Sequence, residues 1–131
     1  MKTSSREETI AFAKNYAKSL QSGDILLLSG DLGAGKTTFV QGLASGLGIA
    51  EEITSPTYAY MNNYNDKLYH FDCYRIQNAM EAEVLGLTDY FDLDGICVIE
   101  WAENILDILP AECKKIILKK IDENTREIEV L

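Results

Sequence analysis

The sequence predicts an α/β domain in which helices flank a mixed parallel and antiparallel sheet. Short apolar runs at 25–28 and 95–99 have the pattern of strands buried on both faces, as in parallel sheets covered by helices. The runs 57–64 and 67–73 are rich in aromatic and alternating residues, which favours an antiparallel hairpin. Because 131 residues rarely divide between two hydrophobic cores, residues 1–131 are expected to form a single domain.

The N-terminal segment is predicted to form a helix. Ser4 or Ser5, each followed three positions later by a glutamate, supplies a capping-box start. Apolar residues then recur at helical spacing, at Ile10, Ala13, Ala17 and Leu20. Gly23 stands where the C-terminal cap of this helix belongs. After the strand at 25–28, a second helix is predicted from the stripe Phe39, Leu43 and Leu47.

The second half of the chain is predicted to complete the sheet. The hairpin turns at 65–66, an Asn-Asp pair that tolerates the left-handed conformation. Short helices are expected at 81–87 and from the end of the 95–99 strand to about Leu109, where Pro110 prevents continuation. Two final strands are expected at 116–118 and 127–131, joined by a polar turn at 122–125.

Composition and charge exclude several classes of protein. A formal net charge of -9 argues against a free-standing nucleic-acid binder, which needs a basic face. No run approaches the length of a membrane span, and no apolar signal segment begins the chain, so a cytoplasmic protein is expected. Three separated cysteines, Cys73, Cys97 and Cys113, lack metal-ligand spacing and are interpreted as reduced, buried thiols.

Residues 30–37 carry the strongest functional signal. They read G-D-L-G-A-G-K-T, which satisfies the pattern G-x-x-x-x-G-K-[ST] of a phosphate-binding loop (P-loop) at every position. Glycines let backbone N–H groups surround phosphate oxygens, and a helix N-terminus favours anions. The nucleotide-binding residues are predicted to be Gly33, Ala34, Gly35, Lys36, Thr37 and Thr38. Lys36 is expected to reach the β- and γ-phosphates and the Thr37 hydroxyl to ligate Mg²⁺, as in a P-loop NTPase.

Two apolar runs end in a carboxylate. Asp72 follows the run 68–71, and Glu100 follows 96–99. Where such strands are parallel, their carboxyl ends meet at the edge of the sheet that collects ligands. Hydrolysis requires an acid that holds the metal and a group that orients water, so both residues are catalytic and metal-site candidates. The sequence leaves open which of the two contacts Mg²⁺ and which positions water.

Other residues are weaker candidates. A hydroxyl in the segment 55–58, Ser-Pro-Thr-Tyr, is in a position to sense a γ-phosphate as switch loops do. Arg75 is interpreted either as a charge-stabilising or partner-binding residue or as a plain salt-bridge partner. His70 shares a strand face with Asp72, which favours a structural or supporting role over catalysis. Trp101 is expected either to stack on a ligand or partner or to fill the core.

In combination, these motifs resemble the bacterial TsaE (YjeE) family. Besides the phosphate loop with Thr38-Phe39, the resemblance rests on Glu8-Thr9, Ser55-Pro56-Thr57-Tyr58, His70-Phe71-Asp72-Cys73-Tyr74-Arg75, Glu83-Val84-Leu85-Gly86-Leu87 and Glu100-Trp101-Ala102-Glu103. It extends over nearly the whole chain. A P-loop alone does not identify a family, but S-P-T-[FY], H-x-D-x-Y-R and E-W together are specific.

The resemblance implies an ATP-hydrolysing, Mg²⁺-dependent subunit of the machinery that makes N6-threonylcarbamoyladenosine at position 37 of tRNAs decoding ANN codons. It implies slow activity alone, work with TsaB and TsaD, and contact with tRNA through that complex; the free chain is expected to be a monomer or weak oligomer. By the same resemblance, Thr9 lies near the adenine, Thr57 belongs to a switch loop, Asp72 assists the metal, Glu100 supports hydrolysis and Trp101 lies beside the site.

Three alternatives remain open from the sequence. A small-molecule kinase usually needs a lid and several arginines. This chain has neither the length for a lid nor enough arginines, since it has only Arg6, Arg75 and Arg126. A GTP-dependent switch lacks its guanine-reading N/T-K-x-D motif here, since the nearest string, 119–122, fails at its first position. Slow hydrolysis by the chain alone would fit both a nucleotide-binding adaptor with little turnover and a TsaE-like ATPase. ATPase activity measured with and without TsaB and TsaD discriminates between them.

Overall fold

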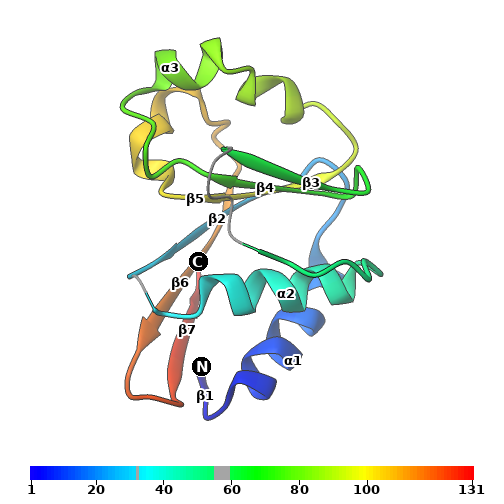
Figure 1. Cartoon of the computed structure of the whole chain (residues 1–131), viewed down its shortest axis with the longest axis vertical. Coiled ribbons are helices and arrows are strands. Elements are labelled where there is room, and N and C mark those ends of the chain that lie inside the picture. The colour runs from blue at the N-terminus through cyan, green and yellow to red at the C-terminus, as the bar shows by residue number, and fades with distance from the viewer. Residues whose placement is uncertain (32, 55–59) are drawn as a thin grey trace.

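The computed structural model describes residues 1–31, 33–54 and 60–131. Within these ranges, strands β1 to β7 form one sheet in the order β1-β7-β6-β2-β5-β4-β3. Helices cover both faces of the sheet (Figure 1), so the predicted α/β class with a mixed sheet is confirmed. The segment 55–58 and the first residues of the predicted hairpin lie outside the described residues.

The centre of the sheet is parallel. Strand β2 (Ile25–Gly30) pairs in parallel with β5 (Ile96–Glu100) on one side and with β6 (Lys114–Lys120) on the other. Strand β5 also pairs in parallel with β4 (Leu68–Asp72). Consequently the carboxyl ends of these strands share one edge, where α/β sheets bind ligands.

Antiparallel strands close the sheet at both sides. Strand β3 (Met61–Tyr64) pairs with β4, while β7 (Arg126–Val130) pairs with β6 and with the short β1 (Lys2–Thr3). The predicted hairpin turn is confirmed, since Asn65 and Asp66 have φ values of 59° and 57°. Strand β1 was not predicted, because two residues are too short to show a pattern.

Two helices cover the face of the sheet that carries the phosphate loop (Figure 1): α1 (Arg6–Tyr16), followed by the 3-10 turn η1 (Ala17–Ser19), and α2 (Lys36–Gly46). Ser5 is the N-cap of α1, and its side chain accepts the backbone N–H of Glu8 at 3.1 Å. The helices approach closely, since a Cβ atom added at Gly42 would lie 2.6 Å from the Cβ of Ala13. This close packing holds α2 against α1.

The opposite face is covered by shorter elements: α3 (Ala79–Val84), the 3-10 helix η2 (Leu87–Tyr90) and the 3-10 helix η3 (Ala102–Ile108) (Figure 1). The helix predicted at 81–87 is divided in two, since α3 ends at Val84, Gly86 has a φ of 83° and Leu87 begins η2. The second predicted helix, after the 95–99 strand, exists as η3. It is a 3-10 helix interrupted at Ile105, where φ is -131°. None of the helices in the described ranges has the length and apolar character needed to cross a membrane.

Side chains alternate between the two faces along each central strand. Leu28, Leu68 and Val98 pack into the core beneath α1 and α2. Phe71 and Ile99, which follow the other parity, pack beneath α3 and η3. Side chains two residues apart in a strand lie on the same face. His70 and Asp72 therefore share the face of Leu68, and Glu100 shares the face of Val98. The histidine and both carboxylates therefore project toward the face that carries α2.

The prediction of reduced, buried thiols is confirmed for two of the three cysteines. Cys73 and Cys97 are buried, Cys113 is partly exposed, and all three are free. Burial raises the pKa of the Cys73 and Cys97 thiols to about 12. A raised pKa depletes the reactive thiolate at neutral pH.

We therefore expect iodoacetamide at pH 8 to modify Cys113 well before Cys73 or Cys97 in the folded protein. Peptide mass spectrometry over a time course measures the order, and full labelling in denaturant is the control. Equal rates at the three thiols in folded protein would contradict the packing described here.

Candidate functional site

The phosphate loop joins the end of β2 to the beginning of α2. Gly33 and Gly35 have φ values of 84° and 98°, a backbone conformation that residues with a Cβ atom rarely adopt. Gly35 is the N-cap of α2, and no side chain among the described residues caps the helix there. The first N–H groups of α2 are thus directed at the loop, as an anion-binding site requires. Thr37 and Thr38, in the first turn, lie beside it, with Thr37 exposed.

Lys36 is turned into the site rather than toward solvent. Its Nζ lies 3.6 Å from Oε1 of Glu100, and only 11% of its side chain is exposed. The same Nζ lies 4.8 Å from the centre of the Trp101 ring, within the range of a cation–π interaction. The lysine of the loop, the carboxylate at the end of β5 and the tryptophan that follows it therefore form one cluster.

Glu100 is the most buried acidic residue of the cluster, with 5% of its surface exposed. Its Oε2 lies 2.5 Å from Nε2 of His70, which is fully buried. In the register of the sheet, Glu100 is opposite Leu28 of β2 and Asp72 of β4. Glu100 thus stands between the phosphate-loop strand and the strand that carries the other carboxylate.

Asp72 lies at the same edge of the sheet but is more exposed than Glu100. Its Oδ1 accepts the backbone N–H of Tyr74 at 3.0 Å. No group of three or more His, Cys, Asp or Glu residues in the described ranges could hold a metal ion. Mg²⁺ does not need such a group, because proteins bind it through one or two carboxylates together with waters and substrate phosphates. Thr37 lies in the first turn of α2, and Asp72 and Glu100 are register partners at the ends of β4 and β5.

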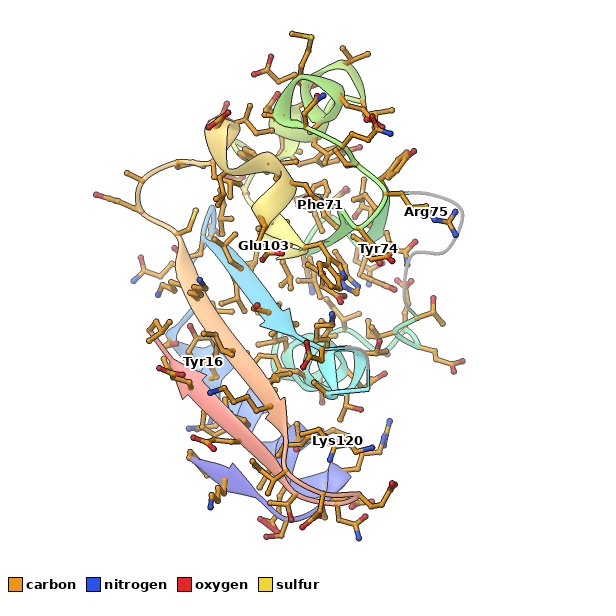
Figure 2. All side chains as sticks on the ribbon, turned by 90° about the vertical axis from the view of Figure 1, so that its left-hand side faces the viewer. Tyr16, Phe71, Tyr74, Arg75, Glu103 and Lys120 are labelled. Carbon is orange, nitrogen blue, oxygen red and sulfur yellow. The ribbon has the colours of Figure 1, made fainter. Side chains whose placement is uncertain are left out.

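Trp101 is held in an unusual backbone conformation. Its φ and ψ values are 58° and 42°, the left-handed region, which costs free energy for a residue other than glycine. The ring of Tyr74 packs edge-on against Trp101, with ring centres 5.1 Å apart. Figure 2 shows Tyr74 and Arg75 beyond the end of β4, with Arg75 directed outward. Trp101 is accordingly a wall of the site, and Arg75 is a surface residue.

Thr9 lies in a different pocket beside the loop. Thr9 is buried, and its hydroxyl is 2.6 Å from that of Thr3. The pocket has a volume of about 210 Å³. Its lining comprises Ser5, Arg6, Thr9, Gly35, Thr38, Glu123, Asn124 and Arg126. The side of the loop away from Glu100 thus borders a cavity to which α1 and the β6–β7 turn contribute.

Arg126 contacts the phosphate loop, which the sequence did not predict. Its Nε donates to the carbonyl oxygen of Ala34 at 3.1 Å, and Nη2 donates to that of Gly33 at 3.3 Å. Its Nη1 donates to the carbonyl of Asp122 in the β6–β7 turn at 2.7 Å. Arg126 therefore ties this turn to the phosphate loop, across 92 and 93 residues of sequence. Nothing local to position 126 signals such a contact.

Replacing Arg126 with glutamine is expected to weaken nucleotide binding roughly 10-fold, because the loop loses two charge-assisted hydrogen bonds that fix its backbone. Isothermal titration calorimetry with Mg–ATP measures the effect. Lys120→Gln is the matched control, because it removes a positive charge at the end of β6, next to the same turn, where Lys120 is paired with the exposed Glu123. Equal affinity for the two variants would show that Arg126 does not organise the loop.

The parallel strands, the loop and the cluster at its mouth define an α/β protein with a candidate phosphate-binding site at the carboxyl edge of its sheet. The family model for "Threonylcarbamoyl adenosine biosynthesis protein TsaE" matches residues 3–128. The chain belongs to the TsaE family.

Individual relatives agree over nearly the full length. A tRNA threonylcarbamoyladenosine biosynthesis protein TsaE of Bacillus subtilis is 47% identical over 130 residues, covering 97% of this chain and 81% of that protein. The protein of the same name from Treponema pallidum is 39% identical over 96% of this chain and 95% of its own length. A crystal structure of Bacillus subtilis YdiB superposes with a TM-score of 0.80 at 43% identity, covering 99% of this chain and 82% of that one.

Proposed function

We propose that the chain is the Mg²⁺-dependent ATPase subunit of the machinery that forms N6-threonylcarbamoyladenosine at position 37 of ANN-decoding tRNAs. In this proposal it acts with TsaB and TsaD and reaches tRNA through them. Membership of the TsaE family supports the pathway. The observation that carries the activity is the contact between Lys36 of the loop and the buried carboxylate of Glu100.

The residues of the site divide between binding and hydrolysis. Lys36 and the N–H groups of α2 bind the phosphates, because they present positive charge at the end of β2. Mg²⁺, when bound, neutralises charge on the phosphates. Thr37 and Asp72 are proposed to hold the ion.

Glu100 is proposed to orient the attacking water, since its Oε1 already lies next to the lysine that binds the terminal phosphates. The pocket lined by Thr9, Gly35 and Thr38 is proposed to receive the adenine. The pocket and Glu100 lie on opposite sides of the loop. One nucleotide bound by the loop would thus have its adenine in the pocket and its terminal phosphate beside Glu100.

Thin-layer chromatography of products from labelled ATP tests the activity. We expect inorganic phosphate, released slowly by the chain alone and faster when TsaB and TsaD are added. A phosphorylated small molecule as product would instead establish a kinase. Unchanged phosphate release in the presence of both partners would remove the support for a partner-dependent subunit.

A further inference from the structure

His70, the single histidine of the chain, is buried beside the site, and one of its two ring nitrogens makes a polar contact. Nε2 of His70 contacts Oε2 of Glu100 at 2.5 Å. Nδ1 has no hydrogen-bond partner among the described residues. A buried polar atom without a partner costs free energy, which an apolar side chain at position 70 would avoid. Filling the core does not by itself account for a histidine at this position; its polar contact with Glu100 does.

The two oxygens of Glu100 have different partners. Oε2 is bound by His70, while Oε1 faces Nζ of Lys36 at 3.6 Å. His70 lies in β4 and Glu100 at the end of β5, and these strands are paired in parallel. The bond between them is therefore anchored to the sheet at both ends and restrains the rotation of the carboxylate.

We propose that His70 is a positioning residue whose Nε2–H holds Oε2 of Glu100, so that Oε1 is presented to the phosphate loop. The proposal rests on the proposed ATPase function. An ionised carboxylate only accepts hydrogen bonds, so Nε2 carries the proton. When Lys36 turns to bind phosphate, Glu100 loses that ion pair but keeps its bond to His70. The carboxylate thus retains its orientation for the attacking water.

Two amide variants of equal polarity separate positioning from packing. In His70→Gln the amide nitrogen reaches the place of Nε2, whereas in His70→Asn it reaches only the place of Nδ1. We expect the asparagine variant to lose about 10- to 100-fold in kcat, as when the partner that orients an active group is removed. The glutamine variant should recover most of that loss. Binding of Mg–ATP, followed by the fluorescence of the single tryptophan beside Lys36, should change little in either variant.

A double-mutant cycle identifies the residue through which His70 acts. If His70 acts only through Glu100, His70→Asn causes no further loss of kcat in a Glu100→Gln background. Thermal unfolding of each variant provides the control for stability. Equal kcat in the asparagine variant and the wild type, or an undiminished loss in the Glu100→Gln background, would overturn the proposal.

NMR tests the bond without ATP. The protein labelled with ¹⁵N-histidine has one imidazole, so its signals need no assignment to a residue, and the coupling of each nitrogen to the ring C–H protons distinguishes Nε2 from Nδ1. We expect a proton on Nε2 that exchanges slowly with water and moves upfield in Glu100→Gln. A proton found only on Nδ1 would overturn the proposal. A normal Nε2–H signal in a protein that does not hydrolyse ATP, alone or with partners, would refute the ATPase function and leave the hydrogen bond intact.

Discussion

Replacing Lys36 with alanine is expected to weaken Mg–ATP binding by roughly 10- to 100-fold, the range for losing a hydrogen bond between charged groups. The ammonium is the only side-chain cation that the described structure places against the carboxylate at the mouth of the loop. Isothermal titration calorimetry at fixed salt measures the change.

The same substitution has a second expected effect. Removing Lys36 leaves Glu100 buried with His70 as its remaining charged or polar contact among those described. An uncompensated buried charge destabilises the folded state, so we expect a lower thermal unfolding midpoint in the absence of nucleotide. Lys18→Ala is the matched control, because Lys18 is an exposed lysine on η1. ATP affinity equal to that of this control would show that Lys36 does not bind phosphate.

Replacing Glu100 with glutamine is expected to separate binding from turnover. The amide has nearly the same shape but cannot accept a proton or carry the negative charge that orients water. We expect kcat to fall about 100-fold or more, as for the loss of an acid–base group, while Mg–ATP remains bound. Phosphate release under single-turnover conditions measures the chemical step directly.

Asp72→Asn gives the comparison that assigns the two carboxylates. If Asp72 contributes to the metal site, its variant should require more Mg²⁺ for half-maximal activity, whereas Glu100→Gln should not be rescued by Mg²⁺. A Glu100→Gln protein that hydrolyses ATP at the wild-type rate would contradict the role assigned to Glu100. Rescue of that variant by Mg²⁺ would exchange the two roles.

The sequence was sufficient to predict which strands bring the site together. Apolar runs ending in Asp72 and Glu100 read as buried strands, and the phosphate loop required a strand before it and a helix after it. Because the central strands are parallel, their carboxyl ends converge, and the observed Lys36–Glu100 contact follows from that geometry. Periodicity also indicated that His70 and Asp72 share a face, which the packing of Leu68 confirms.

Contacts between distant segments were not predictable. Arg126 reaches the loop because β6 and β7 form a hairpin beside β2, and no pattern near position 126 records that arrangement. The pairing of His70 with Glu100 depends on the register between β4 and β5. The break at Ile105, whose side chain is fully buried, was not predicted either. The assignments of Thr9 to adenine and of Thr57 to a switch loop stay predictions.

Formation of N6-threonylcarbamoyladenosine in a reconstituted mixture tests the central claim most directly. The mixture contains TsaB, TsaD, unmodified ANN-decoding tRNA, ATP, an activated threonylcarbamoyl donor, and either the wild-type chain or Glu100→Gln. We predict repeated rounds of tRNA modification with the wild-type chain, and at most one round per complex with the variant, although the variant binds ATP. Equal multiple-turnover modification with both proteins would contradict the claim that ATP hydrolysis at this site supports the pathway.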